Sequence, residues 1–242
     1  MRPTNLLQQT LCILTYFCIT SCGQSKSETT TVNNITTNPQ RLTVEKRQTP
    51  TDFLPKGYTL FETIEGDLNK DGFADWVYII KATDKNRIVK DKYNKQLDQN
   101  RRGIIVVFQK SGYYELAVKN YACFSSENED GGLYFAPYLT VEIKDNTLLI
   151  HYGHGRYGYW EYRFQYKDSD FELISYVSSD GGPVIKSETN IDFVSKKKQV
   201  KVNTNANAVG GDEVFKTSSE TINSDKLLKL SEIKDFDAIR IL

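Results

Sequence analysis

Alternating apolar and polar residues between positions 139 and 177 are the feature that most limits what this chain can fold into. Apolar side chains stand at every second position in the stretches 139–143 and 160–166. Successive side chains of a β-strand point to opposite faces of a sheet, so this period buries one face only. Turn-forming residues, Asp145-Asn146 and Asp168-Ser169-Asp170, separate the stretches. We therefore predict an antiparallel meander with strands at 139–143, 147–152, 160–166 and 171–177.

Two other stretches, 76–80 and 104–108, are apolar at every position and rich in β-branched and aromatic residues. This composition is typical of central strands that are buried on both faces. Residues 84–102 lie between them and are highly charged, which predicts an insertion with a short helix or none. Residues 224–230 predict one or two helical turns. The predicted fold class is mainly β: antiparallel meander sheets packed as a sandwich or as partial propeller-like blades, with at most short helices.

The N-terminal residues 1–21 predict a lipoprotein signal peptide. Arg2 precedes an apolar run at 11–19 that is too short to span a bilayer. The sequence Ile19-Thr20-Ser21-Cys22 resembles a bacterial lipobox, in which Cys22 carries lipid and becomes the first residue of the mature chain. Gly23 follows in place of an aspartate that would signal retention in the inner membrane, so we expect an outer-membrane lipoprotein of the cell envelope.

The remaining chain divides by composition into two parts. Residues 22–52 are rich in Ser, Thr, Asn, Gln and Pro and predict a flexible tether. Residues 53–242 are long enough for a single β-rich domain. The chain has 31 basic and 31 acidic residues, and the predicted leader removes one basic residue and no acid, so nothing favours a nucleic-acid partner. Cys12 and Cys18 are removed with the predicted leader and Cys22 carries lipid, so Cys123 is the one free thiol of the mature chain. We expect it to be buried.

Oxygen-bearing residues alternate in the loop before the 76–80 strand. A calcium ion takes six to eight oxygen ligands at about 2.3–2.6 Å, and a loop with ligands at positions 1, 3, 5, 7 and 9 can wrap around it. Gly72 stands at position 6, where such a loop turns sharply. The predicted ligands are Asp67, Asn69, Asp71, the carbonyl of Phe73, and Asp75.

Position 12 of this loop is Tyr78 rather than the glutamate of an EF-hand, and strands are predicted on both sides. Residues 66–77 instead resemble the FG-GAP or VCBS calcium loop of integrin-type propeller blades, a resemblance that implies a bound calcium ion. The alternative is a hairpin turn rich in Asp, Asn and Gly that holds no metal. Because the loop occurs once, blade-like sheets are expected rather than a full propeller.

A wider resemblance extends over most of the predicted domain. The chain is similar to a group of uncharacterised bacterial lipoproteins and secreted proteins that begin with one FG-GAP-like unit and continue with an aromatic β-meander. The resemblance implies no activity. It rests on residues 66–77, 131–137, 148–164 and 189–193.

Catalytic motifs are sparse in this sequence. His151 and His154 offer two zinc ligands, whereas a catalytic zinc needs a third protein ligand. Asp130 and Asp180 each precede Gly-Gly and suit turns as well as a carboxylate pair. No nucleophile elbow or phosphate-binding glycine loop is present. We therefore expect no enzymatic activity, with a hydrolase acting on envelope polymers as the alternative.

The best candidate for ligand recognition is the aromatic turn before the 160–166 strand. Tyrosine gives a large contact area at low entropic cost, and arginine stacks on rings and pairs with acids. The alternation places Trp160 in the core, whereas Arg156, Tyr157 and Tyr159 are expected to meet a ligand. The sequence therefore predicts a membrane-tethered, calcium-stabilised binding module for a protein or a glycan.

Overall fold

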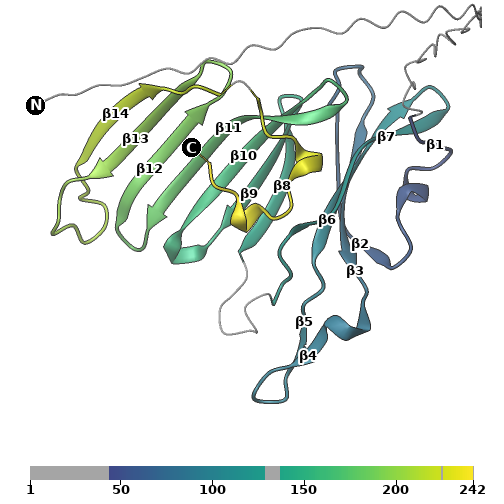
Figure 1. Ribbon diagram of the computed structural model, residues 1–242, viewed down its shortest axis with the longest axis horizontal. Coiled ribbons are helices and arrows are strands. Elements are labelled where there is room, and N and C mark those ends of the chain that lie inside the picture. Colours follow the sequence, from purple (N-terminus) through teal and green to yellow (C-terminus); the bar gives the residue numbers. More distant parts are fainter. Residues whose placement is uncertain (1–43, 129–136, 225, 242) are drawn as a thin grey trace, which may run out of the picture. The chain divides into compact units, whose positions relative to one another are not determined.

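The computed structural model describes residues 44–128, 137–224 and 226–241, apart from the side chain of Arg156 (Figure 1). These residues belong to one compact unit, 42–242. The fold is mainly β and antiparallel, as predicted, and its described helices are 3₁₀ turns of three or four residues. Two sheets make up most of it, one with five strands and one with seven.

The five-stranded sheet has the order β1-β7-β6-β3-β2. Its central strands β3 and β6 are the two predicted from their uniformly apolar sequence, and they pair with each other. The strands are β1 (Lys46–Arg47), β2 (Tyr58–Gly66), β3 (Asp75–Ala82), β6 (Arg102–Lys110) and β7 (Tyr113–Phe124).

Both faces of this sheet are covered by hydrophobic side chains. On one face Ile79 and Ile104 are fully buried in the main core. On the other, Ile80 and Ile105 pack in a smaller cluster with Phe53, which lies in the 3₁₀ turn η1 (Pro50–Phe53). This two-sided burial explains why β3 and β6 have no polar alternation.

The seven-stranded sheet is a continuous meander in the order β14-β13-β12-β11-β10-β9-β8 (Figure 1). The turns Asp145-Asn146 and Asp168-Ser169 have positive φ at both residues, as tight two-residue hairpin turns require. The four predicted strands are confirmed, and three more continue the sheet. The strands are β8 (Tyr138–Lys144), β9 (Thr147–Gly153), β10 (Gly158–Lys167), β11 (Asp170–Gly181), β12 (Ile185–Asp192), β13 (Lys197–Asn203) and β14 (Phe215–Thr221).

The two sheets share the main hydrophobic core. The contact is close where β2 ends, because a Cβ added to Gly66 would lie 2.8 Å from Cγ2 of Ile143 on β8. Side chains from β3, β6 and β7 meet those from β8 to β11 in one cluster. Its fully buried aromatic members include Phe124, Tyr152, Tyr162, Phe164, Phe171 and Phe236.

The C-terminal segment completes this core and crosses one face of the seven-stranded sheet (Figure 1). It contains η4 (Leu230–Glu232) and η5 (Phe236–Ala238). The Phe236 ring stacks on Phe124 with a centroid distance of 5.1 Å. The side-chain amide of Asn120 on β7 donates to the carbonyls of Leu230, at 2.8 Å, and Ile233, at 2.6 Å. The segment therefore fastens the two sheets together.

Three regions differ from the sequence-based expectations. The folded unit begins before Phe53, because β1 lies within the predicted tether and pairs with β7. Residues 226–229 are not helical; Leu173 N–H donates to the Leu228 carbonyl at 2.9 Å, and Lys229 forms a β-bridge. The charged insertion contains a short helix, η2 (Lys85–Arg87), as expected, and also a hairpin of β4 (Ile88–Lys90) and β5 (Gln96–Asp98), which was not expected.

Candidate functional site

The predicted calcium loop connects β2 to β3 and is closed by hydrogen bonds from its own backbone. Asp67 accepts from the N–H groups of Lys70, at 2.7 Å, and Gly72, at 3.1 Å. Asn69 Oδ1 accepts from Asp71 N–H at 2.9 Å, and Asp71 Oδ1 accepts from Phe73 N–H at 3.0 Å. The loop needs left-handed backbone at Gly72, with φ of 85°. The side-chain oxygens of Asp67, Asn69 and Asp71 therefore accept hydrogen bonds from the backbone of the loop itself.

The ninth residue of the loop, Asp75, is buried at the start of β3. Its two carboxylate oxygens accept from Leu68 N–H at 2.8 Å and from Gln109 N–H at 3.1 Å. Burial raises the pKa of Asp75 to about 6, against the lowering effect of these two hydrogen bonds. The carboxylate therefore joins the loop to β3 and β6.

A lysine from a neighbouring strand supplies a positive charge to the loop. Lys110 Nζ lies 2.5 Å from Asp71 Oδ2. Although partial burial opposes it, the hydrogen bond from Lys110 lowers the pKa of Asp71. The loop is thus partly neutralised by an internal cation.

The loop residues match calcium in chemistry, since carboxylate, amide and carbonyl oxygens are the ligands that this ion prefers. In this structure the side-chain oxygens of Asp67, Asn69 and Asp71 accept hydrogen bonds from backbone N–H groups of the loop. Within the described residues, no three His, Cys, Asp or Glu side chains are placed to hold one metal ion. A calcium ion at Asp67, Asn69 and Asp71 would compete with Lys110 for the Asp71 carboxylate.

The predicted recognition turn lies at one end of the seven-stranded sheet. Arg156 and Tyr157 lie in the 3₁₀ turn η3 (Gly155–Tyr157), and the Tyr157 side chain is 59% exposed. Tyr159 begins a row across three strands, because it pairs with Gly153 on β9, which pairs with Tyr138 on β8. Directly paired residues point to the same face, so Tyr138 and Tyr159 stand on either side of a glycine.

Because glycine has no side chain, the row has a gap at Gly153 between the two tyrosines, which we call a slot. A Cβ added to Gly153 would lie 3.6 Å from His151 Nε2 and 3.9 Å from the Tyr138 Cβ, in ordinary van der Waals contact. Tyr138 is 78% exposed. The slot also borders His151, which stacks on Tyr159 with a centroid distance of 5.2 Å and lies 3.8 Å from Glu161. We call these five residues, Tyr138, His151, Gly153, Tyr159 and Glu161, the tyrosine slot.

The slot lies on the face of the sheet that is turned away from the core. Tyr152 and Tyr162 alternate with the slot residues on β9 and β10 and are fully buried in the main core. None of the slot residues belongs to a hydrophobic cluster of the described chain. The face that carries the slot is here called the open face.

The two histidines do not form a common site. His151 contacts Tyr159, whereas the His154 ring lies 3.6 Å from the Trp160 ring, and consecutive residues of β10 point to opposite faces. Burial lowers the pKa of His154 to about 4, and its Nε2 atom has no hydrogen-bond partner among the residues that the structure describes. The imidazole of His154 is therefore part of the packing against Trp160.

The other sequence candidates occupy varied positions. Asp180 lies on β11, opposite Gly158. Asp130 and Cys22 lie outside the described residues. Cys123 is fully buried, as predicted, and burial raises the pKa of its thiol.

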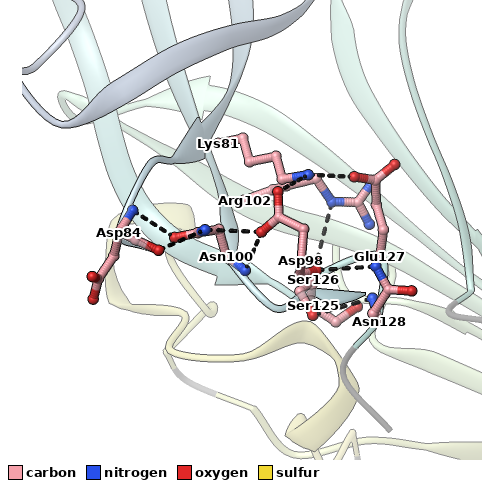
Figure 2. A network of polar contacts seen from close by, with 9 residues as sticks. All are labelled: Lys81, Asp84, Asp98, Asn100, Arg102, Ser125, Ser126, Glu127 and Asn128. Atoms are coloured by element: carbon pink, nitrogen blue, oxygen red, sulfur yellow. Dashed lines mark hydrogen bonds and ion pairs between the residues drawn. The ribbon is translucent and has the colours of Figure 1, made fainter. Parts of the chain in front are cut away.

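A polar network holds the charged insertion against the five-stranded sheet (Figure 2). Lys81 Nζ lies 2.8 Å from Asp98 and 2.5 Å from Glu127. Asn100 is 2% exposed and bridges Asp98 to the backbone of Asp84. Figure 2 shows these side chains in a continuous chain of contacts, which fixes the end of β3 relative to the insertion.

Sequence reasoning missed Tyr138 and Gly153, although a signal was available. A two-residue turn at Asp145-Asn146 fixes the pairing of β8 with β9, and counting outward from it pairs Tyr138 with Gly153. Lys110 was also missed, because its contact with Asp71 depends on how β3 and β6 pair across the insertion.

Comparison with protein-family models, with curated proteins and with solved structures gave no match. None of the helical turns in the described residues is long and apolar enough to cross a membrane.

Proposed function

We propose that this chain is a membrane-tethered lipoprotein of the cell envelope whose β domain binds a protein or glycan ligand through the tyrosine slot. The observation that carries this proposal is the row Tyr138-Gly153-Tyr159 on the open face. Tyr138 is exposed and Tyr159 is half-buried. Tyrosines beside a gap are suited to holding a partner, because each ring offers apolar area and a hydroxyl group.

The dimensions of the slot suit a ring or an extended chain. Neighbouring strands lie about 4.8 Å apart, so Tyr138 and Tyr159, two strands apart, are separated by roughly 10 Å at their backbones. A sugar ring or a peptide backbone fits between two side chains at this spacing. His151 and Glu161 add a hydrogen-bonding group and a negative charge at the border of the slot.

Calcium has a structural role in this proposal. The ion would be held by oxygens of Asp67, Asn69, Asp71, the Phe73 carbonyl and Asp75. It would strengthen a connection that already exists, since Asn146 Nδ2 in the β8–β9 turn donates to the Asp67 carbonyl at 2.7 Å. The loop thereby joins the five-stranded sheet to the hairpin that carries Tyr138 and Gly153.

Membrane tethering through Cys22 is supported by the lipobox resemblance. Replacing Cys22 with Ser is expected to move the protein from the membrane fraction to the soluble envelope fraction, because no lipid can then be attached. Immunoblotting of the two fractions measures this. Membrane retention equal to that of the unmodified chain would contradict the tether.

The binding function can be tested with the full chain carrying Cys22→Ser. The variant is immobilised and used to capture partners from envelope extracts and from a glycan array. Gly153→Val fills the slot at a position where an added Cβ meets other atoms at 3.6 Å or more, so the fold should be retained. Tyr93→Ser is the matched control, since Tyr93 is 76% exposed on the insertion.

The expected result is that Gly153→Val and Tyr138→Ser lose the captured partner whereas Tyr93→Ser keeps it. Equal capture by Gly153→Val and the parent chain would show that the slot does not bind the ligand. Circular dichroism of each variant separates loss of binding from loss of folding.

A further inference from the structure

A pocket lies on the five-stranded sheet, and none of its lining residues belongs to the tyrosine slot. It is a pocket of about 430 Å³ where the β2 start, the β3 end, η2 and the β7 end meet. Small-molecule sites occupy about 300–1,000 Å³, so this pocket has the size for one compact ligand. The side chains that matter to its chemistry are those of Lys56, Tyr58, Asp84, Arg87, Arg101 and Tyr121.

The pocket is rich in positive charge. Among the described residues, Lys56 and Arg87 form no ion pair and donate no side-chain hydrogen bond, and both are exposed. Arg101 is fixed in place, because its Nε donates to the Ala122 carbonyl at 3.0 Å and its guanidinium lies 3.2 Å from Asp235. The pocket therefore has two cationic side chains without an ion pair among the described residues, Lys56 and Arg87, and a third, Arg101, whose position is fixed by its contacts.

Aromatic rings form another part of the lining. Tyr58 and Tyr121 come from different strands, and their ring centroids are 5.4 Å apart with an interplanar angle of 41°. Both rings also pack against the smaller hydrophobic cluster that contains Tyr78 and Ile105. The rings are thus held by the sheet while they line the pocket.

One acidic residue, Asp84, narrows the class of ligand. Its Oδ1 accepts from the backbone and side-chain amides of Asn86, at 2.9 and 3.0 Å, and its backbone is fixed by Asn100 (Figure 2). This carboxylate repels an anion that has no hydrogen-bond donors. It favours an anion that also carries hydroxyl groups, which donate to carboxylates.

We infer that this pocket binds an acidic sugar, a pyranose that carries a carboxylate such as a hexuronic acid. The carboxylate pairs with Arg87 and Lys56, the guanidinium group being matched to a carboxylate in geometry. The apolar face of the ring lies on Tyr58 and Tyr121, and sugar hydroxyls donate to Asp84. An aromatic carboxylate could also pair with the cations and stack on the rings. It has no hydroxyl group, however, that could donate a hydrogen bond to Asp84.

The exposure of Arg87 and Lys56 sets the expected strength. Exposed ion pairs are screened by salt, so binding should weaken as ionic strength rises from 10 to 150 mM, over which the Debye length falls from about 30 to about 8 Å. A hydrogen bond to a charged group contributes enough that Arg87→Gln should weaken binding by about tenfold.

The test is isothermal titration calorimetry of the full Cys22→Ser chain with glucuronate, with glucose and with benzoate. Arg87→Gln is compared with Lys85→Gln, a matched control on the same 3₁₀ turn that is exposed and does not line the pocket. Neither change removes a contact seen within the described fold, so both variants should stay folded.

The expected result is that glucuronate binds and that neither glucose nor benzoate does. Arg87→Gln should weaken glucuronate binding about tenfold and Lys85→Gln should leave it unchanged. Absence of glucuronate binding, equal affinity for benzoate, or equal loss in both variants would each overturn the inference. The outcome is separate from that of the tyrosine slot, because Gly153→Val leaves the lining of this pocket intact.

Discussion

The two sheets of this protein differ in how many of their faces are buried. The five-stranded sheet is packed on both faces, with Ile104 in the main core and Ile105 in the smaller cluster. The seven-stranded sheet buries one face of β8 to β11 in the main core and presents the open face with the tyrosine slot on the other. The strands β12, β13 and β14 contribute no residue to either hydrophobic cluster of the described chain.

This difference separates stability from recognition. In a sheet that is buried on both faces, a substitution disturbs packing whichever face the side chain points to. A face that packs against nothing can change its side chains at little cost to folding, and a binding surface needs that freedom. The slot accordingly lies on the singly buried sheet, and the predicted calcium loop lies where the two sheets meet.

The largest expected effect is loss of packing in the five-stranded sheet. Ile104→Ala removes a fully buried side chain and is expected to lower the free energy of unfolding by about 2–5 kcal/mol. Val202→Ala, at a residue that is 48% exposed on β13, should cost about 0.5 kcal/mol or less. Denaturant unfolding measures both. Similar losses in the two variants would contradict the contrast between the sheets.

A smaller effect is expected from calcium at the junction of the sheets. Binding to the folded state should stabilise it by about 2.7 kcal/mol at a concentration a hundred times the Kd. Lys110→Gln removes the cation that lies against Asp71 and should tighten calcium binding, whereas Lys119→Gln, which breaks an ion pair with Glu45, should not.

Thermal unfolding in calcium and in EDTA measures this calcium response. A melting temperature that is indifferent to calcium in both the parent and Lys110→Gln would argue against a metal site. Equal calcium affinity in these two proteins would remove Lys110 as a competitor.

Two titratable groups are expected to change stability in opposite directions as pH rises: Asp75, buried at the start of β3, and His154, half-buried between β9 and β10. The pKa of Asp75 is raised to about 6, so its contribution to stability is present below about pH 4 and is lost as pH rises through 6. The pKa of His154 is lowered to about 4, so its contribution is present above about pH 6.5 and is lost as pH falls through 4.

In EDTA the two contributions should largely cancel between pH 4 and 6.5. Asp75→Asn should uncover a rise in stability with pH, and His154→Gln should uncover a fall, each of about 2 kcal/mol. His151→Gln, on the open face, is the matched control. Urea unfolding at several pH values gives the slopes, and slopes of the same sign in the two variants would refute the assignment.

The smallest expected effect on stability is at the slot itself. Tyr138→Ser changes a residue that is 78% exposed and should alter the free energy of unfolding by about 0.5 kcal/mol or less, although it should abolish ligand capture. A loss of several kcal/mol would show that the open face contributes to folding.

Much of the fold could be predicted because burial and turns leave local signatures. The apolar residues whose alternation predicted β8 to β11, such as Tyr162 and Phe164, are buried in the core of the structure. The Asp145-Asn146 turn was predicted from its two residues alone, and both have positive φ. Strands that extend beyond the core have no such signature, and β14, with the sequence Phe-Lys-Thr-Ser-Ser-Glu-Thr, was missed.

The candidate sites were less accessible to sequence reasoning, since they depend on pairing between distant residues. Lys110 reaches Asp71 across 39 positions, and Tyr121 meets Tyr58 through strands that are not neighbours in the chain. Residues 224–230 were predicted to form one or two helical turns. Leu230 begins η4, whereas residues 228 and 229 are extended and pair with β11. Tertiary contacts here outweighed local preference.

The C-terminal segment has a consequence for biosynthesis. Phe236 fills the centre of the main core, and Asn120 binds carbonyls that lie 110 and 113 positions further along the chain. A ribosome makes these residues after every strand of both sheets, at about 5–20 residues per second. Until they emerge, the rings of Phe124, Tyr152 and Tyr162 lack their contacts with Phe236. The nascent chain should therefore remain open to chaperones and to export machinery until its synthesis has passed Phe236.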